Sequence, residues 1–368
     1  MRFNLISPFL LVLFLLPLLS TAQDYQTQAS DLLQNAIAAD QYAGITAAIA
    51  VDGQTRWIDS AGHCDEDRST PCTDETVYRI ASITKTMTAV AALQLVERGA
   101  LLLDEPIATY LPNYPKPAAT QITSRMLLHH TSGIPAYASG KEAETQEQYN
   151  TLQEAFTIFQ DRELLFTPGS GYSYTSYGYV VLGAVIEAAS GQAYGEYLQE
   201  HIWNVAEMEH TGIEEFGKEY AAYSVFFTRN RKGKIKSGTA NNLSNRVPAG
   251  GVYATVGDLL RFGQALMDGR LITAESLAMM QQVPDVDRGQ NNPYGMGAFL
   301  YGDNPSFGPV IGHSAEQTGV SGQIMMMPDK KLTVVVLSNT ARAWKDAVQL
   351  SVQLFPLAAQ ALENAPEN

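Results

Sequence analysis

Short hydrophobic runs bounded by polar turn residues occur near both ends of the chain, whereas its middle carries hydrophobic residues at helical spacing. Residues 46–53 and 56–62 predict two strands with a turn at Asp52-Gly53, a dipeptide typical of hairpins. Residues 322–328 and 331–338 predict a second pair of strands. The two pairs are expected to form one antiparallel sheet from the N- and C-terminal segments.

Helices are expected between these strand pairs and outside them. The predicted helices cover 24–40, 82–98, 123–130, 180–190, 193–207, 255–267 and 341–362. A polar stretch at 141–165 also has helical spacing, and 222–237 predicts a hairpin. The fold class is therefore α/β (α+β), an antiparallel sheet flanked by helices. We expect one catalytic domain over 23–368 with a mostly helical subdomain at about 100–250.

The first 22 residues have the pattern of a secretory signal peptide. Arg2 supplies the positive start, 9–19 form the apolar core, and Ser20-Thr21-Ala22 has small residues at a cleavage site. Cleavage is expected near Ala22-Gln23, with a secreted or periplasmic mature protein and no stable membrane span. The alternative is an uncleaved anchor, for which the apolar core is short and interrupted by a proline.

Composition and charge narrow the possible partners. The chain has 368 residues, 45% of them hydrophobic, and a formal net charge of −14. It lacks a basic tract that could follow a phosphate backbone, so we do not expect a nucleic acid partner. The densest basic cluster, at 229–236, is interpreted as a solvated hairpin tip. The oligomeric state is left open by the sequence.

Two cysteines, Cys64 and Cys72, flank a polar loop. In an exported protein they are expected to form a disulfide, and two free thiols are the alternative. A metal site is not expected, because only His63 lies at ligand spacing from them.

Ser82 stands three residues before Lys85 at the start of a predicted helix, which puts hydroxyl and amine on one face. The amine can accept the hydroxyl proton, and the helix N-terminus favours the resulting alkoxide. The spacing alone also fits an N-capping serine with an exposed lysine. However, the helix is apolar nearly all round, which predicts burial, and a buried lysine is costly without a role. We therefore interpret Ser82 as an activated nucleophile that needs neither metal nor cofactor.

Three more segments follow in chain order. They are 127–135 (Leu-Leu-His-His-Thr-Ser-Gly-Ile-Pro), Tyr174-Thr175-Ser176 and His313-Ser314-Ala315. With Ser82 and Lys85, this order resembles the serine β-lactamase and penicillin-binding-protein superfamily. The most similar branch is the class C-like one, which also holds esterases and D-amino-acid peptidases.

The resemblance covers about 24–360, and 249–262 also resembles the class C-like branch. Segments 80–85 and 175–179 look most like the β-lactamase-like serine proteases of mitochondria and their bacterial relatives. The fold implied is that of the β-lactamases and DD-peptidases.

The resemblance also implies a role for individual residues. Ser82 matches the family nucleophile, Lys85 its neighbouring base, and Tyr174 the tyrosine that passes a proton to the leaving group. His313 and Ser314 match the substrate-binding third motif. The oxyanion hole would use the backbone N–H groups of Ser82 and Glu316.

Three positions differ from the family pattern or add to it. Ser176 stands where an asparagine is common, which shortens the reach toward lysine and substrate. Ala315 stands where a glycine is common, and its methyl group is expected to narrow the approach to the strand. Glu316 would either face the cleft, where it repels carboxylates or binds an amine, or point outward from the strand.

We therefore expect an exported serine hydrolase that forms an acyl-enzyme on Ser82, without a cofactor. Its substrates would be small peptides, amides or esters, with small peptides, including D-amino-acid ones, first and esters next, and with weak or no β-lactamase activity. The alternative is a catalytically idle penicillin-binding-type binding or assembly protein on the same fold. An α/β-hydrolase is excluded because the chain has no Gly-x-Ser-x-Gly motif.

Overall fold

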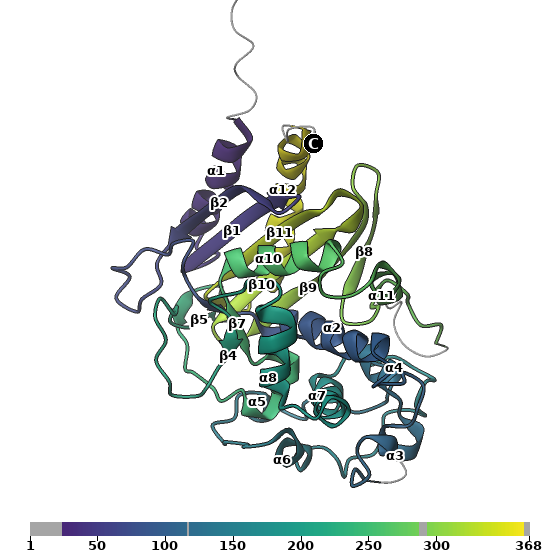
Figure 1. Ribbon diagram of the computed structural model, residues 1–368. Helices are drawn as coiled ribbons and strands as arrows, with labels where there is room; N and C mark the ends of the chain where they lie inside the picture. The colour runs from purple at the N-terminus through teal and green to yellow at the C-terminus, as the bar shows by residue number, and fades with distance from the viewer. Residues whose placement is uncertain (1–23, 116–117, 287–292, 364–368) are drawn as a thin grey trace, which may run out of the picture.

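The computed structural model describes residues 24–115, 118–286 and 293–363. The predicted signal peptide at 1–22 and its cleavage site lie outside these residues. Strands of the main sheet occupy the upper half of Figure 1, and most of the short helices lie below them.

The main sheet has six antiparallel strands in the order β2-β1-β11-β10-β9-β8. Its strands are β1 (Gly44–Val51), β2 (Gln54–Gly62), β8 (Phe299–Asn304), β9 (Gly308–Gln317), β10 (Val320–Met327) and β11 (Leu332–Ser338). Strand β1 pairs directly with β11, from Ile45 opposite Ser338 to Val51 opposite Leu332. The predicted sheet of N- and C-terminal segments is thus confirmed, and with it the fold class.

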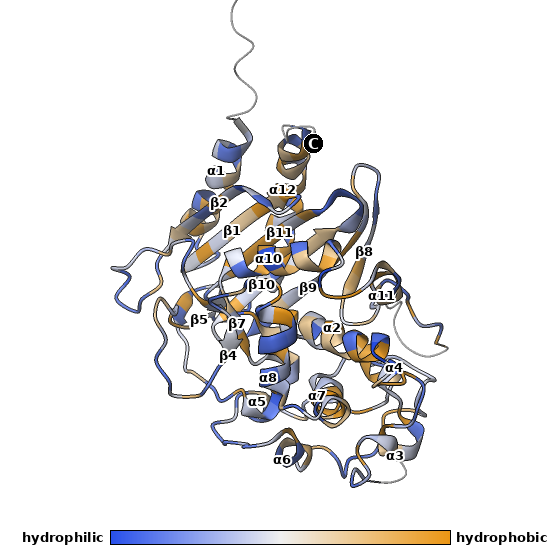
Figure 2. Cartoon of the chain, viewed as in Figure 1, coloured by the Kyte–Doolittle hydropathy of each residue, from blue (hydrophilic) through white to orange (hydrophobic). Residues whose placement is uncertain are grey.

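Successive residues of the central strands face opposite layers, as the pleat requires. Ile45, Ala47 and Ile49 of β1 pack with the terminal helices α1 (Asp24–Ala38) and α12 (Trp344–Glu363). Ala48 and Ala50 face the other way, into the larger core that contains α10 (Val256–Met267). Both faces are therefore covered, and Figure 2 shows hydrophobic positions running along the strands while the outer loops are hydrophilic.

The helical part packs around two long buried helices, α2 (Thr84–Glu97) and α7 (Ser176–Ser190). The shorter helices are α3 (Ala118–Gln121), α4 (Ser124–Leu128), α5 (Gly140–Ala143), α6 (Leu152–Phe156), α8 (Tyr194–Leu198), α9 (Val247–Gly250) and α11 (Ala274–Met280). Two three-stranded sheets complete the fold, one of β3 (Tyr78–Arg79), β7 (Val252–Ala254) and β4 (Gly212–Ile213), and one of β12 (Thr340–Ala341), β5 (Phe227–Arg229) and β6 (Ile235–Ser237). Among the described helices, none is both long and apolar enough to cross a bilayer.

Several element boundaries differ from the predicted ones. The 141–165 stretch contains only the short helices α5 and α6, because its polar side chains form local hydrogen bonds instead of a continuous helix. The last helix begins at Trp344 rather than at 341, because Thr340 and Ala341 pair with β5. Strand β9 contains the whole third motif, which we expected just before the paired strands.

A disulfide joins Cys64 to Cys72 at the end of β2. The loop that it closes is ordered further by Asp65, whose carboxylate accepts hydrogen bonds from the backbone N–H and hydroxyl groups of Ser69 and Thr70. The backbone N–H of Val225 donates to the carbonyl of Cys64, which ties the loop to the segment before β5.

Removing this disulfide is expected to lower the free energy of unfolding by about 2–3 kcal/mol, because an open loop gains conformational freedom in the unfolded chain. The measurement is urea unfolding of the Cys64→Ser/Cys72→Ser variant beside the oxidised wild type. A reduced wild-type sample serves as control and should match the variant. A difference below about 0.5 kcal/mol would contradict this argument, because the opened loop would then gain almost no conformational freedom in the unfolded chain.

Candidate active site

Ser82 lies in a single 3-10 turn, Ala81–Ile83, that leads into α2. Ala81 has a φ of 44°, in the left-handed region that disfavours a side chain with a Cβ atom. Strain of this kind is retained where the surrounding structure requires it, often beside reacting groups. Here it turns the chain from β3 into the helix and leaves Ser82 partly exposed between α2 and β9.

Lys85 is completely buried one turn further along. Its amine donates to the Ser82 hydroxyl at 3.0 Å and to the backbone carbonyl of Ala249 at 2.8 Å. Burial, and then the positive charge of Arg246, lower the pKa of the Lys85 amine far below its usual value. A neutral amine at hydrogen-bond distance from a serine hydroxyl can accept its proton.

Tyr174 forms the wall opposite Lys85, whose nitrogen lies 4.9 Å from the centre of the tyrosine ring. Burial raises the pKa of the Tyr174 phenol well above its usual value, although the neighbouring Ser82 side chain opposes this shift. The next residue, Thr175, caps α7 and donates its backbone N–H to His130 Nδ1 at 3.2 Å. His130 therefore fixes the backbone beside Tyr174. Because its pKa is raised, the phenol of Tyr174 stays protonated at physiological pH and can donate a proton.

His313 is buried on β9 and lines the larger of the two cavities beside Ser82. Its Nδ1 lies 2.7 Å from the carbonyl of Ser314, and its Nε2 lies 3.2 Å from the hydroxyl of Tyr294. Burial, together with the neighbouring Lys85, lowers the pKa of His313 to about 3. A neutral imidazole then donates from Nδ1 to Ser314 and accepts from Tyr294, so His313 orders this wall without carrying charge.

One backbone edge of β9 faces away from its sheet neighbours beside Ser82. The pairing of β8 with β9 reaches Gly312, opposite Phe299, and within the described strands 313–317 pair only with β10. A substrate in extended conformation could hydrogen-bond to such a free edge. Glu316 lies on this edge and in the walls of both cavities that Ser82 lines, where an oxyanion donor is expected.

The Glu316 side chain has partners of its own. One carboxylate oxygen accepts from the Ser321 hydroxyl at 2.7 Å, and the other accepts from the backbone N–H of Arg342 at 2.6 Å. Burial raises the pKa of this carboxyl group. The carboxylate is therefore held in place by Ser321 and by the backbone just before α12.

One of the predicted departures has a different consequence from the one expected. Ala315 is fully buried in the large core and lines neither cavity beside Ser82, so its methyl group does not narrow the cleft. The pleat explains this, because Ser314 and Glu316 occupy the opposite face of β9. Ser176 lines the smaller cavity, as expected for the second motif, and the amine of Lys85 bonds to Ser82 and to the Ala249 carbonyl.

Two cavities meet at Ser82 and Tyr174. The larger one, about 380 Å³, has an aromatic and apolar lining that includes Phe299, Tyr301 and Trp344. The smaller one, about 230 Å³, is more polar and is lined by Ser176, Arg246 and Gln317, among others. The site therefore offers an apolar volume on one side of the nucleophile and a polar volume on the other.

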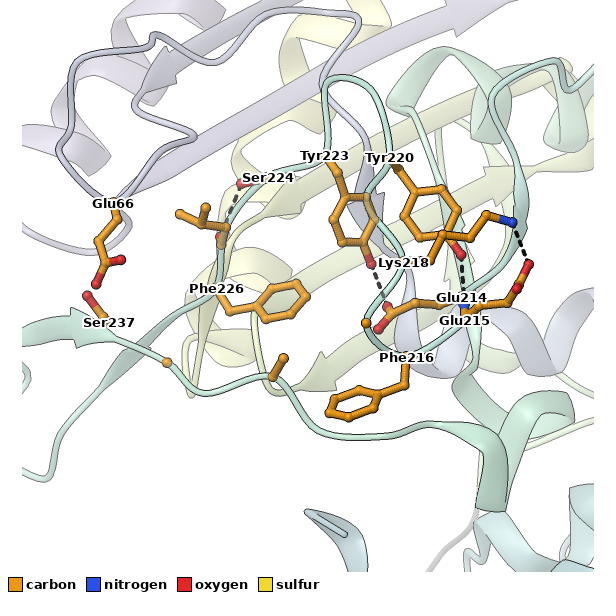
Figure 3. Close-up of a pocket in the computed structure, with 14 residues that line it drawn as sticks. Glu66, Glu214, Glu215, Phe216, Lys218, Tyr220, Tyr223, Ser224, Phe226 and Ser237 are labelled. Atoms are coloured by element: carbon orange, nitrogen blue, oxygen red, sulfur yellow. Dashed lines mark hydrogen bonds and ion pairs between the residues drawn. The ribbon is translucent and has the colours of Figure 1, made fainter. Parts of the chain in front are cut away.

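A third cavity, of about 390 Å³, lies next to the site but does not include Ser82. Figure 3 shows the hydroxyl of Tyr223 bonded to Glu214 in its wall. Behind this wall Arg79 forms a bidentate ion pair with Glu214 and donates to the carbonyl of Thr318, which lines the smaller active-site cavity. The Arg79 pair thus braces the turn between β9 and β10.

Sequence reasoning missed Tyr294, Phe299, Trp344 and Arg246. The aromatic residues reach the site from β8, α12 and the loop before β8 and belong to no motif. Arg246 directly precedes α9, and α9 ends in Ala249-Gly250, the first two residues of the 249–262 segment that resembles the class C-like branch. This nearness to a family segment was the one feature of the sequence that could have pointed to Arg246. Within the described chain, no three His, Cys, Asp or Glu side chains are grouped so that they could hold a metal ion.

Comparison with known proteins gives concordant results. The family model described as Beta-lactamase matches residues 29–355. The human mitochondrial serine beta-lactamase-like protein LACTB is 28% identical over 293 residues, which cover 61% of this chain and 53% of that protein. The putative penicillin-binding protein PbpX of Bacillus subtilis (strain 168) is 31% identical over 260 residues, covering 69% of this chain and 61% of PbpX. The chain thus spans about half to three fifths of the length of these curated relatives.

A solved structure is similar over nearly its whole length. It is the D-stereospecific amidohydrolase from Streptomyces sp., with 25% identity and a TM-score of 0.76, and the match covers 89% of this chain and 98% of that one.

Proposed function

The chain belongs to the β-lactamase family, and we propose that it is a serine hydrolase that cleaves small amide, peptide or ester substrates through an acyl-enzyme on Ser82. The observation that carries the proposal is the contact between Ser82 and Lys85, 3.0 Å apart, with the amine buried and its pKa lowered. A lysine held neutral in this way is a base, not a structural cation.

Acylation would begin when Lys85 takes the Ser82 proton as Oγ attacks the substrate carbonyl. The new oxyanion would be stabilised by backbone N–H groups at Ser82 and Glu316. The bond to the leaving group then breaks, and the leaving group receives a proton through Tyr174, which Lys85 resupplies. Water attacks the resulting ester in the second half, gives its proton to the same groups and frees the acid and Ser82.

We place D-amino-acid peptides and amides first among substrates, with esters next. The similarity to a D-stereospecific amidohydrolase supports this order. We expect weak or no β-lactamase activity, because Ser176 leaves Lys85 without the side-chain contact that an asparagine would supply.

Export is part of the proposal. The signal-like segment at 1–22 supports it, and so does the disulfide between Cys64 and Cys72, a bond that persists in oxidising compartments. The second candidate function, a catalytically idle binding protein, is favoured by the departure at Ser176, whereas Ala315 lies away from both cavities and does not support it. The buried contact between Ser82 and Lys85 argues against it, because such an arrangement is costly to keep without chemistry.

The test is covalent labelling of the mature protein with a fluorophosphonate probe and, separately, with a labelled penicillin. We expect a fluorophosphonate adduct located at Ser82 by intact mass and peptide mapping, and little labelling by penicillin. The control is the Ser82→Ala variant, which should stay unlabelled while keeping the circular dichroism spectrum of the wild type. A folded wild type that forms no adduct with either probe would support the binding-protein alternative.

A further inference from the structure

A fourth cavity, of about 450 Å³, lies in the helical part of the protein. Its walls come from the loop 110–114, from α6 and the residues after it, and from the last turn of α7. Helix α6 lies at the lower edge of the molecule in Figure 1. The three cavities described above share none of its lining residues, so a ligand there would occupy a site of its own.

Three aromatic side chains line this cavity, those of Tyr110, Tyr114 and Phe156. The rings of Tyr114 and Phe156 meet edge to face with their centres 5.2 Å apart, and both residues are buried. The hydroxyl of Tyr110 accepts the backbone N–H of Leu102 at 2.8 Å, which holds the third ring in place. The cavity thus has a preformed aromatic wall.

Glu187 is the one charged residue among the described residues that line the cavity. Its Oε1 accepts the backbone N–H of Tyr194 at 3.0 Å. Burial raises the pKa of the Glu187 carboxyl group, and the Tyr194 N–H and then the side chain of Gln153 oppose this shift. No lysine or arginine of the described chain forms an ion pair with Glu187. The described chain therefore gives this carboxylate neutral partners.

Other carboxylates that are partly or fully withdrawn from water have stronger partners in this protein. Asp258, Glu142 and Glu214 each pair with an arginine. Glu316 accepts hydrogen bonds at both of its oxygens. Such partners offset the cost of taking a carboxylate out of water. Glu187 has no such pair and lines a cavity, which leaves room for a cation from solution.

We propose that the cavity lined by Glu187, called the Glu187 cavity below, binds a small organic ammonium ion. An ammonium group is attracted both by a carboxylate and by the faces of aromatic rings, most strongly where water is excluded. A metal ion fits poorly, because Mg²⁺ and Ca²⁺ need several oxygen ligands and Glu187 is the single carboxylate of the described lining. The proposed site is independent of the chemistry at Ser82.

The cavity in Figure 3 also combines aromatic rings with carboxylates, but there the protein supplies the cations itself. The amine of Lys218 lies 5.5 Å from the centre of the Tyr220 ring, and the guanidinium carbon of Arg79 lies 4.1 Å from the centre of the Phe226 ring. In the part of the chain that the structure describes, no lysine or arginine lies over the aromatic rings of the Glu187 cavity. We therefore expect an organic cation to bind in the Glu187 cavity and not in the one of Figure 3.

The experiment is calorimetric titration of the wild type, at low salt, with choline and with its neutral carbon isostere dimethylbutanol. The two probes have the same shape, and only choline carries a charge. We expect choline to bind at one site with a Kd of about 0.1–1 mM, and the isostere to bind at least about tenfold more weakly. Ser82→Ala should bind choline as the wild type does, because the nucleophile does not line this cavity.

Matched variants locate the site. Glu187→Gln keeps the shape of the side chain and an oxygen that can accept from Tyr194, and it should weaken choline binding about tenfold or more. Tyr110→Leu should also weaken binding, whereas Tyr110→Phe keeps the ring and should retain the affinity. Two controls should bind as the wild type does, namely Glu163→Gln, at an exposed carboxylate after α6, and Tyr220→Leu, in the cavity of Figure 3.

A wild type that does not bind choline, or that binds the isostere as tightly, would overturn the proposal, and so would binding that survives in a folded Glu187→Gln protein. If Glu187→Gln does not fold, the two Tyr110 variants decide, and equal affinities of Tyr110→Leu and Tyr110→Phe would reject the site. Choline binding that is seen only in a Lys116→Gln variant would also overturn the proposal. In that case a lysine outside the described residues would already neutralise Glu187.

Discussion

Replacing Lys85 by methionine is expected to lower kcat/KM by about 10²- to 10⁴-fold, the range associated with loss of a positioned general base. The side chain keeps its volume in a completely buried position but cannot take the Ser82 proton. Steady-state kinetics with a peptide, amide or ester substrate that the wild type cleaves provide the measurement. A loss of less than about tenfold would show that another group activates Ser82.

The pH dependence of the wild type tests the same assignment. Only the neutral amine is a base, so kcat/KM should rise with pH through the lowered pKa of Lys85 and then level off. Tyr174 should not cause a loss below pH 10, because burial raises the pKa of its phenol well above 10.0. A rate that falls between pH 7 and pH 9 would contradict these two protonation states.

The free energy of unfolding should also depend on pH through the lowered pKa of Lys85. The unfolded chain protonates Lys85 below its ordinary pKa of 10.5, whereas the folded protein does so only below the lowered pKa. Between these two values unfolding takes up a proton, so this residue makes the free energy of unfolding rise with pH. Lys85→Met lacks that contribution, and the difference between the two proteins should therefore change with pH across this window.

The part of the site that could be predicted from sequence is the part set by local geometry or by motif. Ser82 and Lys85 share a face because three residues span most of a helical turn, wherever the helix packs. Tyr174 and His313 were found through a resemblance in motif order. The main strands followed from their hydrophobic runs, which fill both faces of a covered sheet.

The remaining features depend on packing between distant segments. Whether an arginine finds a carboxylate cannot be read from its neighbours, and Arg79 and Arg246 differ in this respect only in three dimensions. The Glu316 carboxylate accepts a hydrogen bond from the backbone of Arg342, just before α12. This contact could not be predicted, because we expected the helix to begin at 341 and it begins at Trp344. The effect of Ala315 depends on which face of β9 borders the cleft, which the motif alone does not specify.

Replacing Arg79 by methionine is expected to lower the free energy of unfolding by about 3–5 kcal/mol, because it leaves Glu214 buried without its counter-charge. The side chains of Arg79 and Glu214 are 0% and 7% exposed. Arg125 and Asp104 form a pair of the same bidentate geometry, with side chains 38% and 73% exposed. Arg125→Met should therefore cost less than about 1 kcal/mol, as solvent-exposed pairs do.

Urea unfolding of both variants measures the contrast, and the double variant Arg79→Met/Glu214→Leu separates its causes. If the unpaired carboxylate is responsible, removing it as well should restore much of the lost stability. If the double variant is as unstable as Arg79→Met, the hydrogen bonds of Arg79 to Asn241 and Thr318 carry the effect instead. Equal losses for Arg79→Met and Arg125→Met would contradict the argument, because burial is what distinguishes the two pairs.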